Sequence, residues 1–413
     1  MTKTDKEGQR KTPILRFKGF TDDWEQRQLG EIGTTYSGLS GKNKSDFEKG
    51  NSNFVTFLEV LNNPILKNID LTNKVEIKEN EHQNKVKRND ILFNTSSETP
   101  EEVATSTVVD VNQSNLYLNS FCFGFRPNVK FSNYYIGYYL RSNHFRNRVF
   151  CLAQGISRYN ISKKSLIKLK LSLPKLEEQD KIGKIFNQVE LLLTLYERKL
   201  KLLSQVKKYF LDNLFTEKEY PNLRFKGFTD AWEQRKLGTI TDTYSGGTPQ
   251  VSVKDYYSNN EIPFIRSSDI HKNKTELYIS SKGLENSSAK LVSKGHILYA
   301  LYGATSGEVD ISKIDGAINQ AVLCINAHND LNYFLMLFLS KNKDKIVRKY
   351  IQGGQGNLSA SIIKKIKVFT TSELEETKIS TLVKILSDII TLYENKQQHL
   401  TEIKKELLNT MFI

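Results

Sequence analysis

The stretch that decides the fold is RFKGFTDDWEQRQLGEIGTTYSG, residues 16–38. It is written a second time as RFKGFTDAWEQRKLGTITDTYSG at residues 224–246, with 18 of the 23 aligned positions identical. A match of this quality indicates an internal duplication, which has to be recognised before other features are interpreted. The chain therefore contains two copies of one structural unit.

The correspondence continues more weakly behind this opening segment. Four further pairs of segments align: 54–60 with 264–270, 90–93 with 296–299, 154–155 with 352–353, and 194–197 with 391–394. Similarity is thus high at the two ends of each copy and low in the middle. Two units that share a scaffold and recognise different things would show this distribution. Uneven decay of a duplicated domain is the alternative.

Length and composition narrow the class of protein. The 413 residues exceed one ordinary core, so two or three domains are expected. Twenty-two Phe and 19 Tyr are too many for a disordered chain. Sixty Lys and Arg against 46 Asp and Glu leave a net charge of +14, which indicates a polyanionic partner. Nucleic acid is the first hypothesis, and a negatively charged membrane surface fits the charge equally well.

Several classes are not supported. The first 20 residues contain no apolar run typical of a secretory signal. The longest apolar run, Tyr333–Leu339, is far shorter than the roughly 20 residues that cross a bilayer. Cys122, Cys151 and Cys324 form no CxxC pair, and an odd number of cysteines is not a disulfide framework. We expect a cytoplasmic, reduced protein whose cysteines are small buried apolar residues.

Two segments have the periodicity of long helices. From Leu176 to Phe215, and from Leu374 to the C-terminus, apolar residues recur every three or four positions. Each segment of about 40 residues would be about 60 Å long. The apolar stripes would be covered if the helices packed together as an antiparallel coiled coil, whose seam we predict to contain Leu192, Leu203, Leu386 and Leu400. An ordinary helix packed on its own domain is the alternative.

The regions between these segments predict mixed α/β structure. Strands are expected within 86–93, 116–125, 168–173, 291–299, 317–325 and 366–369, and helices at 134–140 and 333–339. Ser162 and Ser359 are expected N-caps of short helices. The predicted fold class is α+β: two pseudo-symmetric mixed α/β domains separated by two long antiparallel coiled-coil helices. The expected limits are 1–175 for the N-terminal domain, 176–220 for the first helical region, 221–373 for the C-terminal domain and 374–413 for the second helical region.

Searches for catalytic motifs find none. No GxxxxGK[ST] phosphate loop is present, since GLSGK at residues 38–42 has the wrong spacing. The chain has no HExxH, no GxGxxG after a strand, and no Asn/Asp-Pro-Pro-aromatic tetrapeptide. The six histidines have no matching partners between the copies. The sequence favours a binding protein over an enzyme.

The repeated motifs carry a family resemblance. Trp-Glu-Gln-Arg, Leu-Gly and Tyr-Ser-Gly open each half, at Trp24 and at Trp232. Further landmarks follow in order at residues 173–179, 245–249, 262–270, 295–303 and 353–359. With these motifs in duplicate, the chain resembles the specificity subunit of bacterial type I restriction-modification systems. The chain departs from the family pattern at two places. His296 stands where an acidic residue is usual, and Asp90 is that acidic residue in the first half. The second half also lacks a proline equivalent to Pro174 and has Thr377 in place of Gln179.

The resemblance implies a division of labour. Residues 1–175 and 221–373 would be target recognition domains, each reading one half of a split sequence in double-stranded DNA. The helical regions would dock two methyltransferase subunits, with restriction and translocase subunits as further partners. S-adenosylmethionine, ATP and Mg would be used by those partners, and this chain would bind no cofactor or metal. A stand-alone nuclease or methyltransferase, and a DNA-binding scaffold protein without restriction partners, are the competing hypotheses.

The duplication also sorts candidate residues. Residues shared by both halves cannot select different sequences, so divergent polar residues are expected to read bases. The candidates in the first half are Lys42, Asn43, Lys44, Asn94, Thr95, Ser96, Arg158 and Tyr159. Those in the second half are Thr248, Gln250, Arg266, Ser267, Tyr302, Thr305, Gln352 and Gln355. Expected partner-binding residues are Glu177, Glu178, Gln179, Tyr196, Glu375, Glu376 and Tyr393. For any one of the base-reading candidates alone, a solvated loop residue is the alternative; Trp24 and Trp232 are expected to pack in the core.

Overall fold

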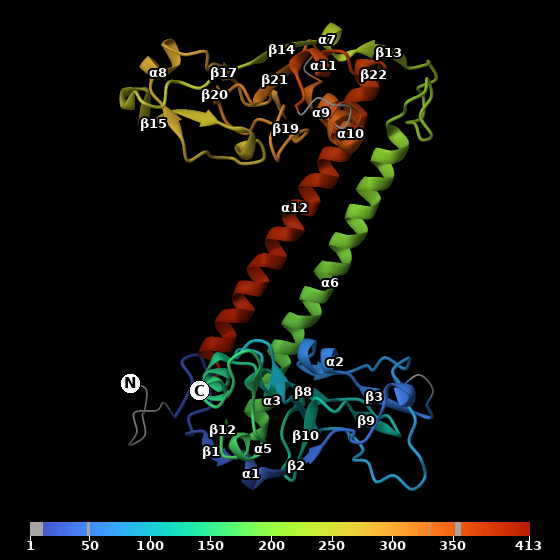
Figure 1. Cartoon of the computed structure of the whole chain (residues 1–413), viewed down its shortest axis with the longest axis vertical. Helices are drawn as coiled ribbons and strands as arrows, with labels where there is room; N and C mark the ends of the chain where they lie inside the picture. The colour runs from blue at the N-terminus through green and yellow to red at the C-terminus, as the bar shows by residue number, and fades with distance from the viewer. Residues whose placement is uncertain (1–10, 48–49, 330, 352–356) are drawn as a thin grey trace. The chain divides into compact units, whose positions relative to one another are not determined.

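The computed structural model describes residues 11–47, 50–329, 331–351 and 357–413 (Figure 1). The candidates Gln352 and Gln355 lie outside the described residues. Contacts divide the chain into unit 1, Met1–Arg198 with Glu394–Ile413, and unit 2, Lys199–Tyr393. This division cuts both long helices, so the sequence-derived domain limits stay predictions.

Unit 1 is built on a five-stranded main sheet. Its order is β2 (Gly33–Ser37), β10 (Cys122–Pro127), β6 (Ile91–Asn94), β8 (Ser106–Val109) and β4 (Ile65–Leu66). The smaller sheets are β5 (Lys74–Val75) with β3 (Ser52–Val55) and β9 (Leu116–Leu118), β1 (Glu25–Gln28) with β12 (Lys170–Leu173), and β7 (Ser96–Ser97) with β11 (Tyr159–Asn160). The short helices are α1 (Leu29–Ile32), η1 (Lys44–Phe47), α2 (Phe57–Asn62), α3 (Asn133–Tyr139), α4 (Asn143–Phe150) and α5 (Lys163–Leu166).

Unit 2 repeats this plan. Its main sheet is β14 (Thr241–Ser245), β21 (Val322–Ala327), β18 (Ile297–Ala300) and β19 (Val309–Ile311), in that order. The other sheets are β16 (Tyr278–Ile279), β15 (Tyr257–Ile265), β20 (Gly316–Ile318) and β17 (Lys290–Val292), and β13 (Glu233–Lys236) with β22 (Lys367–Thr370). The short helices are α7 (Leu237–Ile240), η2 (Lys254–Tyr256), η3 (Ser267–Asp269), α8 (Ser281–Glu285), α9 (Asn332–Lys341), α10 (Lys343–Ile351) and α11 (Ala360–Lys364).

Aromatic residues fill the two cores as the sequence predicts. Trp24 is buried with its ring 5.9 Å from that of Tyr135, edge to face. Trp232 is buried against Phe334 in unit 2, at 6.1 Å. The expected N-caps are confirmed: the Ser162 hydroxyl accepts from the Ser165 amide, and the Ser359 hydroxyl accepts from the Ile362 amide. The predicted helices at 134–140 and 333–339 correspond to α3 and α9.

The expected strands at 116–125 and 317–325 are each two strands. An asparagine breaks each segment, because the Asn119 side chain accepts from the Phe121 amide at 2.9 Å and the Asn319 side chain accepts from the Ala321 amide at 3.1 Å. Asn side chains stabilise such turns by bonding to a backbone amide two residues later. The continuous apolar run conceals this break.

Two long helices complete the units: α6 (Leu176–Leu214) and α12 (Glu373–Thr410). In unit 1 the start of α6 packs on the end of α12. The Phe186 ring stacks on that of Phe412 with centroids 5.3 Å apart, and Lys404 Nζ lies 2.5 Å from a carboxylate oxygen of Glu190. As numbers rise along α6 they fall along α12, so the helices are antiparallel, as expected.

The predicted seam needs one correction. Leu203, Leu386 and Leu400 are half-buried, but Leu192 is 43% exposed and its neighbour Leu193 only 9%. Placing Leu192 on the seam was therefore wrong. Three consecutive leucines occupy positions 191–193, and the three-and-four spacing fits more than one of them. Burial distinguishes Leu193 from Leu192, and periodicity does not.

Both long helices begin at a buried ion pair. The Arg16 guanidinium donates to both oxygens of Glu178 at 2.7 and 2.9 Å, and that of Arg224 donates to both oxygens of Glu375 at 2.7 and 2.8 Å. These equivalent pairs align Gln179 with Glu376. The interpretation that Thr377 replaces Gln179 is therefore wrong. It came from aligning Leu176 with Leu374, which shifts the two sequences by one residue.

Candidate nucleic-acid interface

Each main sheet has one end at which its longest loops start, which we call the loop edge. In unit 1 it is where β2 and β6 end and β10 begins, since Ser37 lies opposite Phe123 and Asn94 opposite Cys122. In unit 2 it is where β14 and β18 end and β21 begins, at Ser245 and Ala300. Chain segments distant in sequence meet at these edges.

Two candidate segments of the first half meet at the loop edge of unit 1, and a third follows a strand that ends there. Residues 42–44 follow β2, and residues 94–96 end β6 and enter β7. Arg158 and Tyr159 come from more than 60 residues further along, brought there by pairing of β7 with β11 and by a hydrogen bond from the Ile161 amide to the Thr95 carbonyl at 3.0 Å. The structure thus brings residues 94–96 and 158–159 together, although the sequence selected them separately.

Their exposure differs sharply. Lys44 and Arg158 are exposed, and Tyr159 is half-buried. Asn94 is fully buried and its side-chain amide donates to the Glu102 carbonyl at 3.0 Å. The Lys42 side chain is only 3% exposed, pairs with Glu81 and donates to the Glu76 carbonyl at 2.6 Å. Burial and internal partners give Lys42 and Asn94 a structural role, and a direct DNA contact by either stays a prediction.

The remaining first-half candidates lie between these extremes. Asn43 is exposed. Its backbone amide donates to a carboxylate oxygen of Asp46 at 2.7 Å, and this bond shapes the start of η1. Thr95 is half-buried, whereas Ser96 is buried in the β7–β11 pair. Asn43, Lys44 and Arg158 are therefore the candidates of this half with the most accessible side chains.

The loop edge of unit 2 is assembled in the same way. Thr248 and Gln250 follow β14, and Tyr302 and Thr305 follow β18. The Thr248 hydroxyl donates to the Gln320 side chain at 2.7 Å. The Leu358 amide donates to the Leu301 carbonyl at 2.9 Å, the counterpart of the bond between Ile161 and Thr95.

Arg266 and Ser267 start from the end of β15 in the neighbouring sheet. Arg266 Nε donates to a carboxylate oxygen of the buried Asp269 at 3.3 Å, and Lys272 donates to the other oxygen at 2.8 Å. Burial raises the pKa of Asp269, but hydrogen bonds from Lys272 and Arg266 outweigh it and hold the pKa below its ordinary value. In unit 1, Thr56 and Glu59 form the equivalent cap, so the scaffold is shared and the Arg266 side chain is specific to unit 2.

One long segment of unit 1 carries a charge that favours a polyanion. Between Val111 and Leu176 the sequence has eleven Lys and Arg and no Asp or Glu. Some are bonded internally, as Arg141 is to the carbonyls of Ser106 and Val60. Arg158, Lys164 and Lys168 are exposed. An acid-free, basic segment of this kind suits contacts to phosphates.

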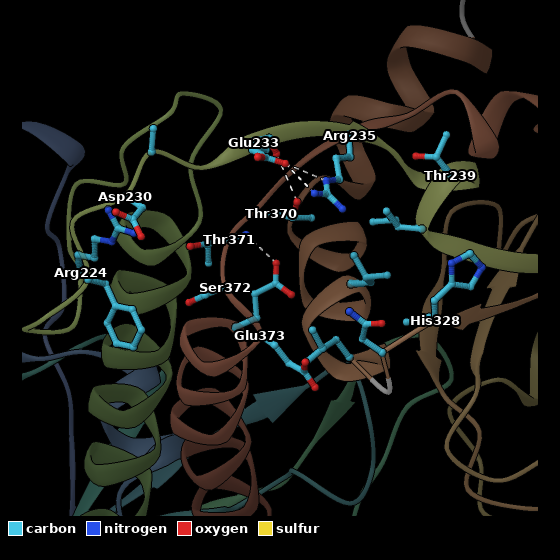
Figure 2. A pocket seen from close by; sticks show the side chains of 18 residues that line it. Arg224, Asp230, Glu233, Arg235, Thr239, His328, Thr370, Thr371, Ser372 and Glu373 are labelled. Atoms are coloured by element: carbon cyan, nitrogen blue, oxygen red, sulfur yellow. Dashed lines mark hydrogen bonds and ion pairs between the residues drawn. The ribbon is translucent and has the colours of Figure 1, made fainter.

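Unit 2 has a pocket of about 570 Å³ at the start of α12, away from the loop edge (Figure 2). Its lining includes Asp230, His328 and Glu376, and a Glu233–Arg235 pair at 2.7 Å. Glu376 is 5% exposed and accepts one hydrogen bond from the Thr371 amide at 2.9 Å. Burial raises the pKa of Glu376 to about 7. Within the described residues, no group of three or more His, Cys, Asp or Glu is placed to hold a metal ion.

The candidates for partner binding separate into two groups. Glu178, Gln179, Glu375 and Glu376 are buried. Gln179, for instance, accepts from the Ser132 amide at 3.1 Å and donates to the Pro174 carbonyl at 2.9 Å. Glu177 is exposed, while Tyr196 and Tyr393 are half-buried on their helices. The buried four serve the fold, and their contact with a partner stays a prediction.

Sequence reasoning missed three apolar residues at the loop edges. Phe121 and Ile156 in unit 1 and Val251 in unit 2 are exposed. The search considered divergent polar residues only. The sequence did contain a signal for Phe121. The two units have equivalent Asn turns, and the residue two positions after the asparagine is Phe121 in unit 1 but Ala321 in unit 2.

Two matched units with a common scaffold and divergent loop edges define a duplicated binding protein. The sequence profile of the type I restriction modification DNA specificity domain matches residues 21–205 and again residues 229–405. The chain therefore belongs to this family and carries two copies of its domain, which confirms the resemblance seen in the motifs.

Individual relatives agree with this assignment. A putative type I restriction enzyme MjaX specificity subunit from Methanocaldococcus jannaschii is 24% identical over 411 residues, covering 94% of this chain and 93% of the relative. The MjaIX specificity subunit of that organism is 28% identical over 192 residues, 44% of each chain. The crystal structure of a type I restriction-modification system S subunit from M. genitalium has the same fold, with a TM-score of 0.63 at 14% identity, covering 97% of this chain and 99% of that one. No helix in the described part of the chain is long and apolar enough to cross a membrane.

Proposed function

We propose that this chain selects the DNA sequence on which a type I restriction-modification complex acts. Unit 1 and unit 2 each read one half of a split target in double-stranded DNA. The observation that carries the proposal is the contrast within each unit: matching hydrogen bonds hold the scaffold, while the segments gathered at the loop edge differ. Shared scaffold with divergent loops is what two readers of different half-sites require.

The chemistry belongs to partner subunits in this proposal. Two methyltransferase subunits dock on the long helices and transfer methyl groups from S-adenosylmethionine, and restriction subunits use ATP and Mg. The absence of any recognised nucleotide-binding or catalytic motif from the sequence supports this division. The complex acts in the cytoplasm, where the host DNA is. The basic segment between Val111 and Leu176 supplies affinity for DNA phosphates, and this affinity does not depend on the DNA sequence.

Exchange of the part of unit 1 that contains its loop edge tests the proposal. Residues 42–158 would be replaced by the same region of another family member, leaving the Arg16–Glu178 pair and both long helices unchanged. Methylation-sensitive sequencing of cellular DNA should show one half-site changed and the other kept. A change in both half-sites would contradict independent reading.

A binding assay separates the proposal from a stand-alone DNA-binding scaffold. Gel shifts with the determined target would compare this chain alone and with its methyltransferase partner. Specific binding that needs, or is strengthened by, the partner supports the proposal. Identical binding with and without it, together with failure to co-purify, favours the scaffold.

A further inference from the structure

The two most exposed large apolar side chains in the described part of the chain both lie at loop edges. Ile156 in unit 1 is 96% exposed and Val251 in unit 2 is 75% exposed. Apolar side chains scattered singly over a surface are ordinary. These two lie within two residues, along the chain, of polar residues that we propose read bases, Arg158 in unit 1 and Gln250 in unit 2.

The loop that carries Ile156 has a defined shape. Gln154 and Asn160 close its neck with two backbone hydrogen bonds of 2.9 and 2.8 Å. Gly155 has a φ of 137°, and a Cβ there would lie 2.0 Å from the Arg158 carbonyl oxygen. Only glycine fits this position without strain. The backbone therefore holds Ile156 at the tip of the loop, in water.

Phe121 adds a second apolar group at the same edge. It is 58% exposed, and its carbonyl accepts from the Thr95 amide at 2.9 Å. Its counterpart Ala321 accepts from the Leu301 amide at the same distance, so the backbone is matched and the side chain is not. Unit 1 thus presents an isoleucine and a phenylalanine, whereas unit 2 presents a valine from the loop after β14.

We propose that these side chains read thymine methyl groups in the major groove: Ile156 and Phe121 in the half-site of unit 1, and Val251 in the half-site of unit 2. The C5-methyl of thymine is the apolar feature that the major groove displays, and apolar side chains recognise it. Ile156 lies in the basic segment between Val111 and Leu176, which has no Asp or Glu and favours contact with DNA phosphates. Burying an apolar side chain against a methyl group is favourable. This inference rests on the proposed function and adds the chemical feature that is read.

Uracil substitution tests the contact because it removes only the methyl group. The complex of this chain with its methyltransferase partner would be titrated with its determined target duplex, each thymine in turn replaced by uracil. Loss of one methyl contact should weaken binding about fourfold, the factor that ~0.8 kcal/mol per buried methyl-sized group gives. The double variant Ile156→Ala with Phe121→Ala should abolish the effect in the half-site of unit 1 and leave it in the other, and Val251→Ala should do the reverse.

A matched control is Leu71→Ala, which truncates a side chain that is 56% exposed between β4 and β5. It should leave uracil sensitivity unchanged in both half-sites. All three variants should keep the parent melting temperature, because the side chains removed are exposed.

Three results would overturn the inference while leaving the proposed function intact. They are half-sites without any A·T pair, equal binding of thymine and uracil duplexes, and uracil sensitivity that persists in the alanine variants. Insertion of Ile156 between bases as a wedge would produce bent DNA and equal binding of the two duplexes. A complex with no sequence preference would overturn the proposed function itself.

Discussion

The two main sheets carry different side chains where β6 and β18 begin. In unit 1 the buried Asp90 receives two bonds from Arg126, at 2.9 and 2.7 Å, and one from the Tyr36 hydroxyl at 2.6 Å. In unit 2, His296 takes the aspartate position and lies 3.7 Å from the Cys324 sulfur. The Tyr244 hydroxyl, the counterpart of Tyr36, donates instead to the Leu291 carbonyl at 2.8 Å.

One strand position explains why the tyrosines diverge. Gly124 lies opposite Tyr36, and a Cβ there would be 2.0 Å from the Tyr36 ring. Cys324 occupies this position opposite Tyr244. The strand register is the same in both units. The backbone hydrogen bonds between strands therefore preserve the sheet, although the side chains packed on it differ. This difference teaches that divergence here is not confined to the loops.

The largest expected effect comes from breaking the unit 1 network. Asp90→Ala would leave Tyr36 and the Arg126 side chain, which is 37% exposed, without the buried carboxylate that accepts three hydrogen bonds from them. We expect this loss to cost about 3–4 kcal/mol. His296→Ala in unit 2 should cost less, because no ion pair is lost. Urea unfolding at pH 7 measures both. Equal losses from the two variants would contradict the contrast drawn between the sheets.

A second comparison concerns the start of each long helix, where Gln179 in unit 1 faces Glu376 in unit 2. Burial raises the pKa of Glu376 from 4.5 to about 7, so folding favours its protonated form. The stability this contributes is full below pH 4.5 and is lost as the pH rises through 7. Glu376→Gln should therefore stabilise unit 2 at pH 8 by roughly 3 kcal/mol and have little effect at pH 4.

The reciprocal variant is the control for that prediction. Gln179→Glu should make unit 1 lose stability over the same pH range, because a carboxylate would then lose the bond donated to the Pro174 carbonyl. Thermal melts at pH 4, 6 and 8 would show both trends. A Glu376→Gln variant that melts in parallel with the parent at every pH would show that Glu376 is ionised without cost.

A smaller effect is expected from transferring one residue between the sheets. Gly124→Cys would force the Tyr36 ring away from Asp90, and overpacking of this kind costs about 1–3 kcal/mol. Cys324→Gly should also destabilise, through loss of packing and added chain entropy, but without breaking an ion pair. In a double variant with Tyr36→Phe, the cost of Gly124→Cys should shrink, since the bond to Asp90 is already absent.

The smallest effect concerns the pocket at the start of α12. In unit 1, Lys175 lies 2.5 Å from Asp22 beside a pocket of about 240 Å³. Ser372 and Asp230 hold the equivalent positions in unit 2, where the pocket is about 570 Å³. Ser372→Lys should add an exposed ion pair and raise the melting temperature slightly at low salt only. An increase that survives 1 M salt would point to packing instead.

Much of the layout follows from patterns that short segments encode. The repeat, the two long helices and the caps at Ser162 and Ser359 depend on spacing and local hydrogen bonding, which the sequence displays directly. The choice between Leu192 and Leu193 does not, because both satisfy the same spacing. Nor does the alignment of Gln179 with Glu376, which the ion pairs to Arg16 and Arg224 fix.

The sequence by itself determined the duplication, the fold class, the family and the segments from which a site could be built. Only the tertiary structure decided which residues face outward at that site. Lys42 and Asn94 look like accessible polar residues in the sequence but are held by internal partners, whereas the apolar Ile156 is 96% exposed. The physical reason is that exposure depends on which distant strands pair, here β7 with β11, and no local pattern contains that information.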